Sequence, residues 1–351
     1  MSQFIQLHLL TSYPPSNVNR DDLGRPKTAK MGGFDRLRIS SQSLKRNWRV
    51  SDVFGSSMGE NIGIRTKRFG IDIYNELLAN NVPEKQAKES AVKIAGVFGK
   101  NKKANKNNPL EEFEIEQLAH ISPTEKAAAL ALVDTLVEEN RLPTEDELKL
   151  LKNESTAVDI ALFGRMLASS PEFNTDAACQ VAHALSVHSV VIEDDYFTAV
   201  DDLNDGKTDS GSAHIGESGF AAALFYSNIC INKTQLIDNL NGDKDLANRA
   251  IQALVKAAVT VSPKGKQNSF ASQAYASFAL AEKGTQQPRN LSVAFLKPID
   301  EQDQATAAIN ALQKQVENFD KVYGDCADAR YQFNAIAGEG SLAELLEFVA
   351  S

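Results

Sequence analysis

The segment from Asn19 to Arg49 holds the residue types that most clearly suggest chemistry. It carries nine basic and three acidic side chains, a net charge of +6, whereas the whole chain carries −9 at pH 7 and the remainder therefore −15. A concentration of Lys and Arg on an otherwise acidic protein usually neutralises a polyanion. The segment therefore predicts contacts with phosphate groups, and the alternative interpretation is a solvated basic helix face.

A short strand followed by a helix is predicted at the centre of this segment. Residues 37–39 alternate apolar and basic side chains, as a half-buried strand does. Ser40 or Ser41 can cap a helix that continues to Arg49. Backbone amides, hydroxyls and the positive end of a helix can hold phosphate beside the cations.

The predicted helix places cations and apolar residues on neighbouring faces. Lys45 and Arg49 are four residues apart and share one face, whereas Leu44 and Trp48 share a face that can pack into a core. The side chains of this segment predicted to contact phosphate are Arg20, Lys27, Arg38, Ser40, Gln42, Lys45, Arg46 and Arg49. Weaker candidates are Lys264 and Lys266 in a second basic loop.

Acidic pairs offer a different chemistry. Asp194-Asp195 and Asp201-Asp202 lie in a polar segment, and paired carboxylates can hold Mg²⁺ and activate water for hydrolysis. The alternative interpretation, a solvated acidic surface, is the one favoured for adjacent Asp residues on an exposed loop. No P-loop, no Rossmann glycine motif and no nucleophile elbow is present.

Histidine and cysteine patterns do not predict a metal site. His183 and His188 are five residues apart at a predicted strand and its end, so their side chains should point to opposite faces. The three cysteines, Cys179, Cys230 and Cys326, are scattered and form no CxxC pair. We therefore expect no zinc site, no cofactor and no disulfide framework, as in a reducing cytoplasm.

The overall composition is that of a soluble globular protein. The chain has 351 residues, 42% hydrophobic and 24% charged, enough for about two domains or one domain with large insertions. No run approaches the roughly 20 apolar residues of a membrane-spanning helix. The N-terminal residues lack the basic region and cleavage site of a signal peptide, so a cytoplasmic location is expected.

Hydrophobic periodicity predicts an α+β fold. Strands are predicted at residues 4–10, 156–166, 177–187, 220–231, 275–280 and 291–296. Helices are predicted at residues 65–80, 83–98, 123–140, 144–152, 246–261, 303–319 and 341–349. The helices between residues 60 and 152 suggest an insertion, the Lys/Asn-rich run 99–109 suggests a mobile loop, and the polar run 188–219 suggests a protruding arm.

Several sequence pieces resemble one protein family. NRDD, then a GG pair, then RISSQSLKR, and later DIALFGRM and GSAHIG, are similar in order and spacing to the CasC-like, Cas-seven-type backbone subunits of type I-E CRISPR Cascade. The resemblance extends over nearly the whole chain and is dense in residues 19–49, 156–166 and 196–216. It implies a modified RRM-like (ferredoxin-like) palm at residues 1–59, 153–187 and 220–351, helical fingers at 60–152 and a thumb hairpin at 188–219.

The resemblance also implies a function. Such subunits are not enzymes; they polymerise along a CRISPR RNA without reading its sequence and expose the guide for pairing with target DNA. The implied partners are crRNA, target DNA through the guide, further copies of the chain, and the large, small, Cas-five-type and Cas-six-type Cascade subunits. Met166 and Ile215 match positions whose side chains press against nucleotides at each kink of the RNA.

Two alternatives remain open at this stage. One is a metal-dependent ribonuclease that uses Asp201 and Asp202 of the thumb. The other is an acidic scaffold whose basic segment docks onto an acidic protein partner. Low aromatic content, 7%, argues against base-stacking platforms of the RRM type and favours phosphate contacts.

Overall fold

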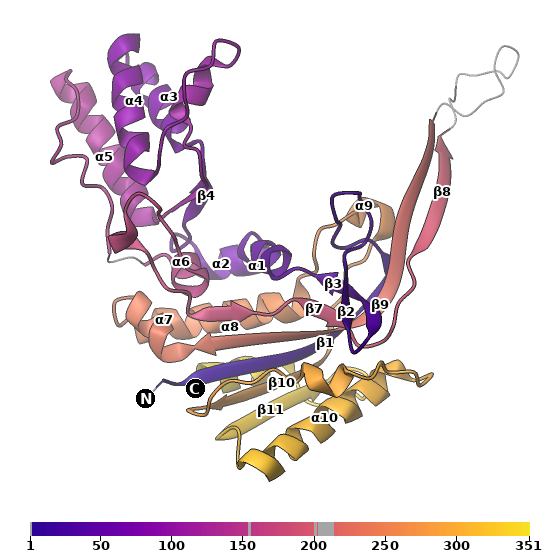
Figure 1. Cartoon of the computed structure of the whole chain (residues 1–351). Coiled ribbons are helices and arrows are strands. Elements are labelled where there is room, and N and C mark those ends of the chain that lie inside the picture. The colour runs from indigo at the N-terminus through magenta and orange to yellow at the C-terminus, as the bar shows by residue number, and fades with distance from the viewer. Residues whose placement is uncertain (1, 154–155, 200–201, 203–213) are drawn as a thin grey trace, which may run out of the picture. The chain divides into compact units, whose positions relative to one another are not determined.

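The computed structural model describes residues 2–153, 156–199, 202 and 214–351 (Figure 1). The chain divides into two compact units. The first unit comprises Met1–Phe54, Val181–Cys230 and Ile251–Ser351, and the second comprises Gly55–Gln180 and Ile231–Ala250. Among the helices of these described ranges, none has the length and apolar character needed to cross a membrane.

The first unit is built on a large sheet. Its strands lie in the spatial order β11 (Ala329–Asn334), β10 (Ala276–Gly284), β1 (Phe4–Ser16), β9 (His214–Asn232), β7 (Ala184–Ser186), β3 (Phe34–Ile39) and β2 (Thr28–Met31). Two further strands, β6 (Cys179–Val181) and β8 (Glu193–Ala199), also pair with β9. The pairings of β10 with β1 and β11, of β7 with β3 and β9, and of β2 with β3 are antiparallel.

Helices cover both faces of this sheet. On one face, α10 (Gln304–Tyr323) and the 3-10 helix η3 (Ser292–Phe295) bury Leu10, Phe278 and Leu312 in a common core. On the other face lie α1 (Ser41–Arg49) and the part of α8 (Lys244–Thr260) that belongs to this unit, as Figure 1 shows. The remaining elements of the unit are α9 (Gln267–Phe270) and α11 (Leu342–Ala350), while α2 (Asp52–Met58) begins in this unit and ends in the other.

A buried charge network ties three strands of the sheet together. The Glu282 carboxylate is 0% exposed and accepts hydrogen bonds from His8 at 3.2 Å, from both Nη atoms of Arg289 at 2.8 and 2.9 Å and from Arg330 at 2.7 Å. Burial alone would raise the pKa of Glu282, but these hydrogen bonds outweigh it and lower the pKa to about 2. The network therefore stabilises the sheet at neutral pH, and this contribution is lost as the pH falls from 4.5 toward 2.

The second unit is mainly helical. Its core is formed by α3 (Phe69–Ala79), α4 (Glu84–Phe98) and α5 (Pro123–Glu139), together with the 3-10 helix η1 (Pro109–Phe113). Its other elements are the antiparallel strand pair β4 (Ile64–Thr66) and β5 (Ala119–Ile121), α6 (Val158–Phe163), η2 (Pro171–Phe173) and α7 (Lys233–Asn239). Ser122 and Glu125 form a capping box that starts α5.

The mixed α and β composition and the antiparallel sheet agree with the predicted fold class, but three predicted elements are wrong. Residues 156–166 contain α6 and an isolated bridge at Arg165 rather than a strand, because all side chains from Val158 to Leu162, including Asp159, are buried and such a run shows no alternation that distinguishes the two. Residues 291–296 contain η3, and Leu291 just before it and Phe295 at its end, four residues apart, are both buried. The third error is the helix predicted at 144–152, and two smaller ones concern the start of α3 and strand β11.

The predicted helix at 144–152 consists of turns instead. Thr144 and Glu147 have the spacing of a helix cap, and Glu147 does accept from the Thr144 amide at 2.8 Å, but the same carboxylate also accepts from Arg141 at 2.6 and 2.8 Å. The helix predicted from residue 65 begins at Phe69, after strand β4, and strand β11 was not predicted. Short segments of this kind carry too little periodicity to be identified from sequence.

Candidate nucleic-acid interface

The centre of the basic segment has the predicted local structure. Strand β3 ends at Ile39, and Ser40 adopts an extended conformation and caps α1 by accepting from the Ser43 amide. Leu44 and Trp48 are buried at 5% and 2% exposure, which confirms that their face of α1 packs into the core. This packing holds the opposite, cationic side of α1 in one orientation toward solvent.

Two asparagines join the separate pieces of the segment. The Asn19 side chain accepts from the Ser40 amide at 2.8 Å, and its carbonyl accepts from the Lys27 amide at 2.8 Å. Asn47, buried on α1, accepts from the Lys264 amide at 3.2 Å. The loop after β1, the strand before α1, the helix itself and the loop near residue 264 are therefore held together within the first unit.

The predicted cations of this surface are accessible. Arg20 and Arg46 are exposed, and Lys27, Arg38 and Lys45 are half-buried. In the described part of the chain none of these five pairs with a carboxylate. Arg49 is half-buried, Gln42 is exposed and Ser40 is buried. We call the five cations the open basic surface.

Two basic residues of the same segment face inward or are paired. Arg36 is 0% exposed and donates to the carbonyls of Ser186 at 3.0 Å and Phe295 at 2.7 Å, so it fastens the β2–β3 hairpin to the sheet. Arg25 forms an exposed ion pair with Asp194 of β8 at 3.0 Å. The charge that this segment presents to solvent is thus lower than its sequence count of +6 suggests.

The amides at the start of α1 are largely satisfied within the chain. The Ser41 amide donates to Nδ1 of His183 at 3.1 Å, and the Ser43 amide donates to the Ser40 hydroxyl at 3.4 Å. We expected free amides at this helix start to bind phosphate. These two amides are not free, because the His183 side chain and the Ser40 hydroxyl already accept their hydrogen bonds.

The second basic loop lies against the first. A Cβ on Gly265 would come within 2.3 Å of the Val18 carbonyl oxygen, so only glycine allows this approach. Lys266 has a left-handed φ of 46° and donates to the Ser218 hydroxyl at 2.5 Å, while the side chain of Lys264 is exposed. A groove of about 700 Å³, lined by both lysines and by polar residues including Gln267 and Asn268, opens beside them.

Met166 lies in the second unit, on a short segment that is fixed on both sides. Arg165 donates to the buried Glu125 carboxylate at 2.7 and 2.9 Å, and the Leu167 amide donates to Asn174 at 2.6 Å. The Met166 side chain itself is 79% exposed, which is unusual for a large apolar residue. The structure therefore presents this methionine to solvent on a rigid support.

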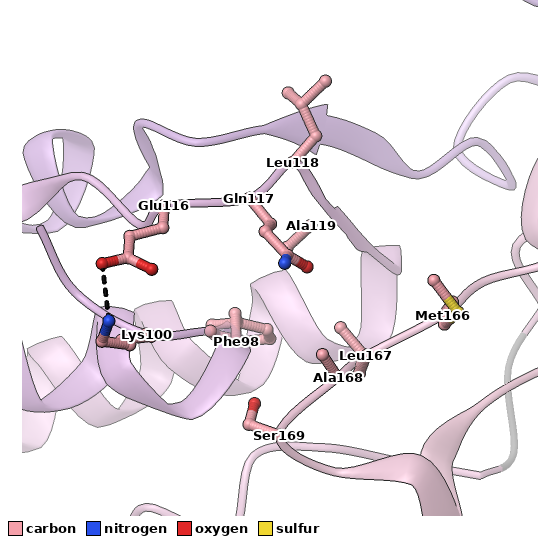
Figure 2. A pocket seen from close by; sticks show the side chains of 11 residues that line it. Phe98, Lys100, Glu116, Gln117, Leu118, Ala119, Met166, Leu167, Ala168 and Ser169 are labelled. Carbon is pink, nitrogen blue, oxygen red and sulfur yellow. Dashed lines mark hydrogen bonds and ion pairs between the residues drawn. The ribbon is translucent and has the colours of Figure 1, made fainter.

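A pocket of about 280 Å³ adjoins Met166 (Figure 2). Apolar side chains, including Phe98 and Leu167, contribute most of its lining. Met166 lies at one end of the pocket and the Lys100–Glu116 ion pair, 2.8 Å long, at the other. The pocket thus combines an apolar floor with a charged rim.

The Lys/Asn run beside this pocket differs from the loop expected there. Lys102 pairs with Glu111 at 3.0 Å and with Glu114 at 2.8 Å, and the Asn101 amide donates to the Val92 carbonyl at 2.8 Å. These contacts attach the run to the helical core instead of leaving it as an unanchored loop.

The predicted arm is only partly described. Strands β8 and β9 pair antiparallel from Glu193 opposite Phe220 to Ala199 opposite His214, with Ile215 opposite Thr198. The Ile215 side chain and Asp201 lie outside the described residues. Asp202 is exposed, and within the described ranges no group of three or more His, Cys, Asp or Glu residues is arranged to hold a metal ion.

Sequence reasoning did not identify Asn19, Asn47 or His183 as parts of this surface. The two asparagines bind backbone groups far away in sequence, and His183 reaches the start of α1 from another strand. Only their occurrence inside or beside polar segments could have drawn attention to them.

Solved structures resemble the whole chain. A chain of a "CRISPR RNA-guided surveillance complex, pre-nicking" has a TM-score of 0.85 and 28% sequence identity, with 99% of both chains covered. A chain of a "CRISPR RNA-guided surveillance complex" has a TM-score of 0.74 and 23% identity with the same coverage, and at that identity it supports the fold alone. A comparison with curated protein sequences finds no match.

A family model matches residues 5–345, which is nearly the complete chain. The match includes the open basic surface, the Met166 segment and the arm. The chain therefore belongs to the family described as CT1975-like protein.

Proposed function

We propose that this protein is a Cas-seven-type subunit that binds CRISPR RNA as a non-catalytic backbone component of a type I-E surveillance complex. The observation that carries the proposal is the open basic surface, five cations held on one scaffold without carboxylate partners among the described residues. A polyanion can neutralise them without first breaking internal ion pairs. The resemblance to a chain of an RNA-guided surveillance complex supports RNA as that polyanion.

The proposed contacts position the RNA and do not read its sequence. Arg20, Lys27, Lys45 and Arg49 would neutralise phosphates, with Arg38, Arg46, Lys264 and Lys266 assisting and Ser40 and Gln42 as hydrogen-bond donors. Such side chains carry no sequence information when they bind phosphate, so one protein can serve every guide. Sequence recognition would then reside in base pairing between the guide and target DNA.

The fold supports the proposed palm, fingers and thumb. Along the chain, β1, α1, β7, β9, α8 and β10 follow the β-α-β-β-α-β succession of a ferredoxin-like unit, and the four strands lie in the spatial order β10, β1, β9, β7. We assign the RRM-like palm to this sheet, the fingers to residues 60–152 and the thumb to residues 188–219. Met166 and Ile215 would press against nucleotides at kinks of the RNA.

The proposed assembly is a filament on one guide. Several copies would bind successive stretches of the CRISPR RNA, with the large, small, Cas-five-type and Cas-six-type subunits completing the complex. The thumb of one copy would clamp the RNA held by the next copy. Because each copy occupies a fixed length of RNA, occupancy should increase in steps as the guide is lengthened.

The step length tests the proposal. Guide RNAs of increasing length are mixed with excess protein, and the number of bound copies is measured by native mass spectrometry or analytical ultracentrifugation. We expect whole-number steps at regular increments, the same for a scrambled sequence of equal length. A single bound copy at every length, or absence of RNA binding by folded protein, would contradict the proposal.

A further inference from the structure

His183 stands beside the open basic surface without having been predicted as part of it. Strand β7 pairs with β3 so that Leu185 lies opposite Arg38 and Ala184 opposite Ile39. The same register places His183 next to Ser40, at the start of α1. Its side chain is exposed, and its Nδ1 atom accepts the Ser41 amide at 3.1 Å.

This hydrogen bond determines which ring nitrogen carries the proton. A backbone amide can only donate, so Nδ1 must present its lone pair, and the proton of the neutral imidazole then resides on Nε2. The Ile39 carbonyl also lies beside the ring, but within the described part of the chain no contact of Nε2 has the distance and angle of a hydrogen bond. The side chain therefore offers one oriented N–H donor to a ligand.

The surroundings favour the neutral imidazole and an anionic ligand. Partial burial lowers the pKa of His183, the nearby charges of Arg38 and Lys27 lower it further, and the Ile39 carbonyl opposes the shift. Arg38 and Lys27 belong to the open basic surface, so an anion attracted by them arrives beside the Nε2–H group.

We infer that His183 binds a phosphodiester oxygen of the RNA through Nε2–H, as a neutral donor between the cations and the start of α1. The inference rests on the proposed function, since it names one more residue of the same RNA-binding surface. A neutral donor releases no counterion on its own account, so it strengthens binding equally at every salt concentration. This property separates it from the neighbouring lysines and arginines.

Two substitutions separate the two ring nitrogens. In His183→Asn the side-chain oxygen can replace Nδ1 and keep the Ser41 contact, but no donor reaches the position of Nε2. In His183→Gln the longer amide can replace the Nε2–H donor, while the Nδ1 acceptor is lost. Because the side chain is exposed, both variants should fold, which thermal unfolding verifies.

RNA affinity of the full-length protein is then measured across a salt series for wild type, both variants and Asn310→Ala, which removes an exposed amide from α10. We expect His183→Asn to weaken binding about three- to tenfold with an unchanged salt slope, because a hydrogen bond to a charged oxygen is lost. His183→Gln and Asn310→Ala should stay within about twofold of wild type.

Other outcomes would overturn the inference. Wild-type affinity in His183→Asn, or equal losses in both variants, would show that Nε2–H does not act as the donor. A salt slope lowered by about one unit in His183→Asn would show a charged imidazole instead. If folded wild-type protein binds no RNA, the proposed function and this inference both fail. If wild type binds RNA but His183→Asn keeps wild-type affinity, or both variants lose affinity equally, the inference alone fails.

Discussion

Two segments of this chain are rich in basic residues, and the structure treats them in opposite ways. In the first unit, Arg20, Lys27, Arg38, Lys45 and Arg46 have no carboxylate partner within the described ranges. In the second unit, Lys100 pairs with Glu116, and Lys102 pairs with Glu111 and Glu114. The first group of cations is available to an external polyanion, whereas Lys100 and Lys102 are already neutralised by carboxylates of the same unit.

The comparison shows that local charge does not identify a binding surface by itself. A phosphate that approaches Lys102 must compete with two carboxylates at about 3 Å, while one that approaches Lys45 competes only with water and salt. The same contrast holds for buried arginines: Arg165 in the second unit is matched by Glu125, and Arg36 in the first unit is bound by backbone carbonyls.

The largest effect on stability is expected at the buried ion pair of the second unit, between Arg165 and Glu125. Glu125→Gln leaves the buried Arg165 without its counter-charge, and we expect a loss of about 3 kcal/mol in the free energy of unfolding. Urea denaturation measures this, with the exposed Asp134→Asn on the same helix as a control expected within about 0.5 kcal/mol of wild type. Equal stability of the two variants would mean that the ion pair contributes little.

The next largest effect is expected on RNA binding by the open basic surface. Lys27→Ala/Lys45→Ala removes two phosphate-neutralising charges, so the salt slope of RNA binding should become shallower by about 1.4 and the affinity at about 0.1 M salt should fall roughly 25-fold. A salt series of binding titrations measures both quantities. An unchanged slope would show that these lysines do not contact RNA phosphates.

A smaller effect is expected in the Lys/Asn run. Lys100→Ala/Lys102→Ala should leave RNA affinity within about twofold of wild type, because both lysines are already paired. Conversely, Glu111→Gln/Glu114→Gln/Glu116→Gln should release them and steepen the salt slope of RNA binding. If Lys100→Ala/Lys102→Ala lost as much RNA affinity as Lys27→Ala/Lys45→Ala, the two basic segments would not differ in RNA binding as we expect.

A small effect is also expected at an exposed ion pair of the basic segment, that between Arg25 and Asp194. Asp194→Asn should free Arg25 for phosphate and strengthen RNA binding by no more than about threefold, with the slope steeper by at most about one unit. Stability should change by less than about 0.5 kcal/mol, since both side chains are nearly half exposed. Weaker RNA binding in this variant would indicate that the pair positions the basic loop.

Local patterns predicted the elements whose signals are contained in one stretch of sequence. The cap at Ser40, the buried Leu44 and Trp48, and helices α4, α5, α8 and α10 follow from spacing and capping residues within a few turns. The error at residues 156–166 occurred where consecutive side chains are all buried, since burial then shows no alternation, and the error at 291–296 occurred in a segment too short to establish a period.

Charge and periodicity are properties of neighbouring residues, so the order of amino acids is enough to indicate a cationic stretch with a capped, amphipathic helix in an acidic chain. Which of its cations remain available depends on contacts that form only in the folded chain. Arg36 is buried against carbonyls, Arg25 meets Asp194, and Ser41 donates to His183. These partners lie more than 100 residues away along the chain, and the folding of the sheet brings them together.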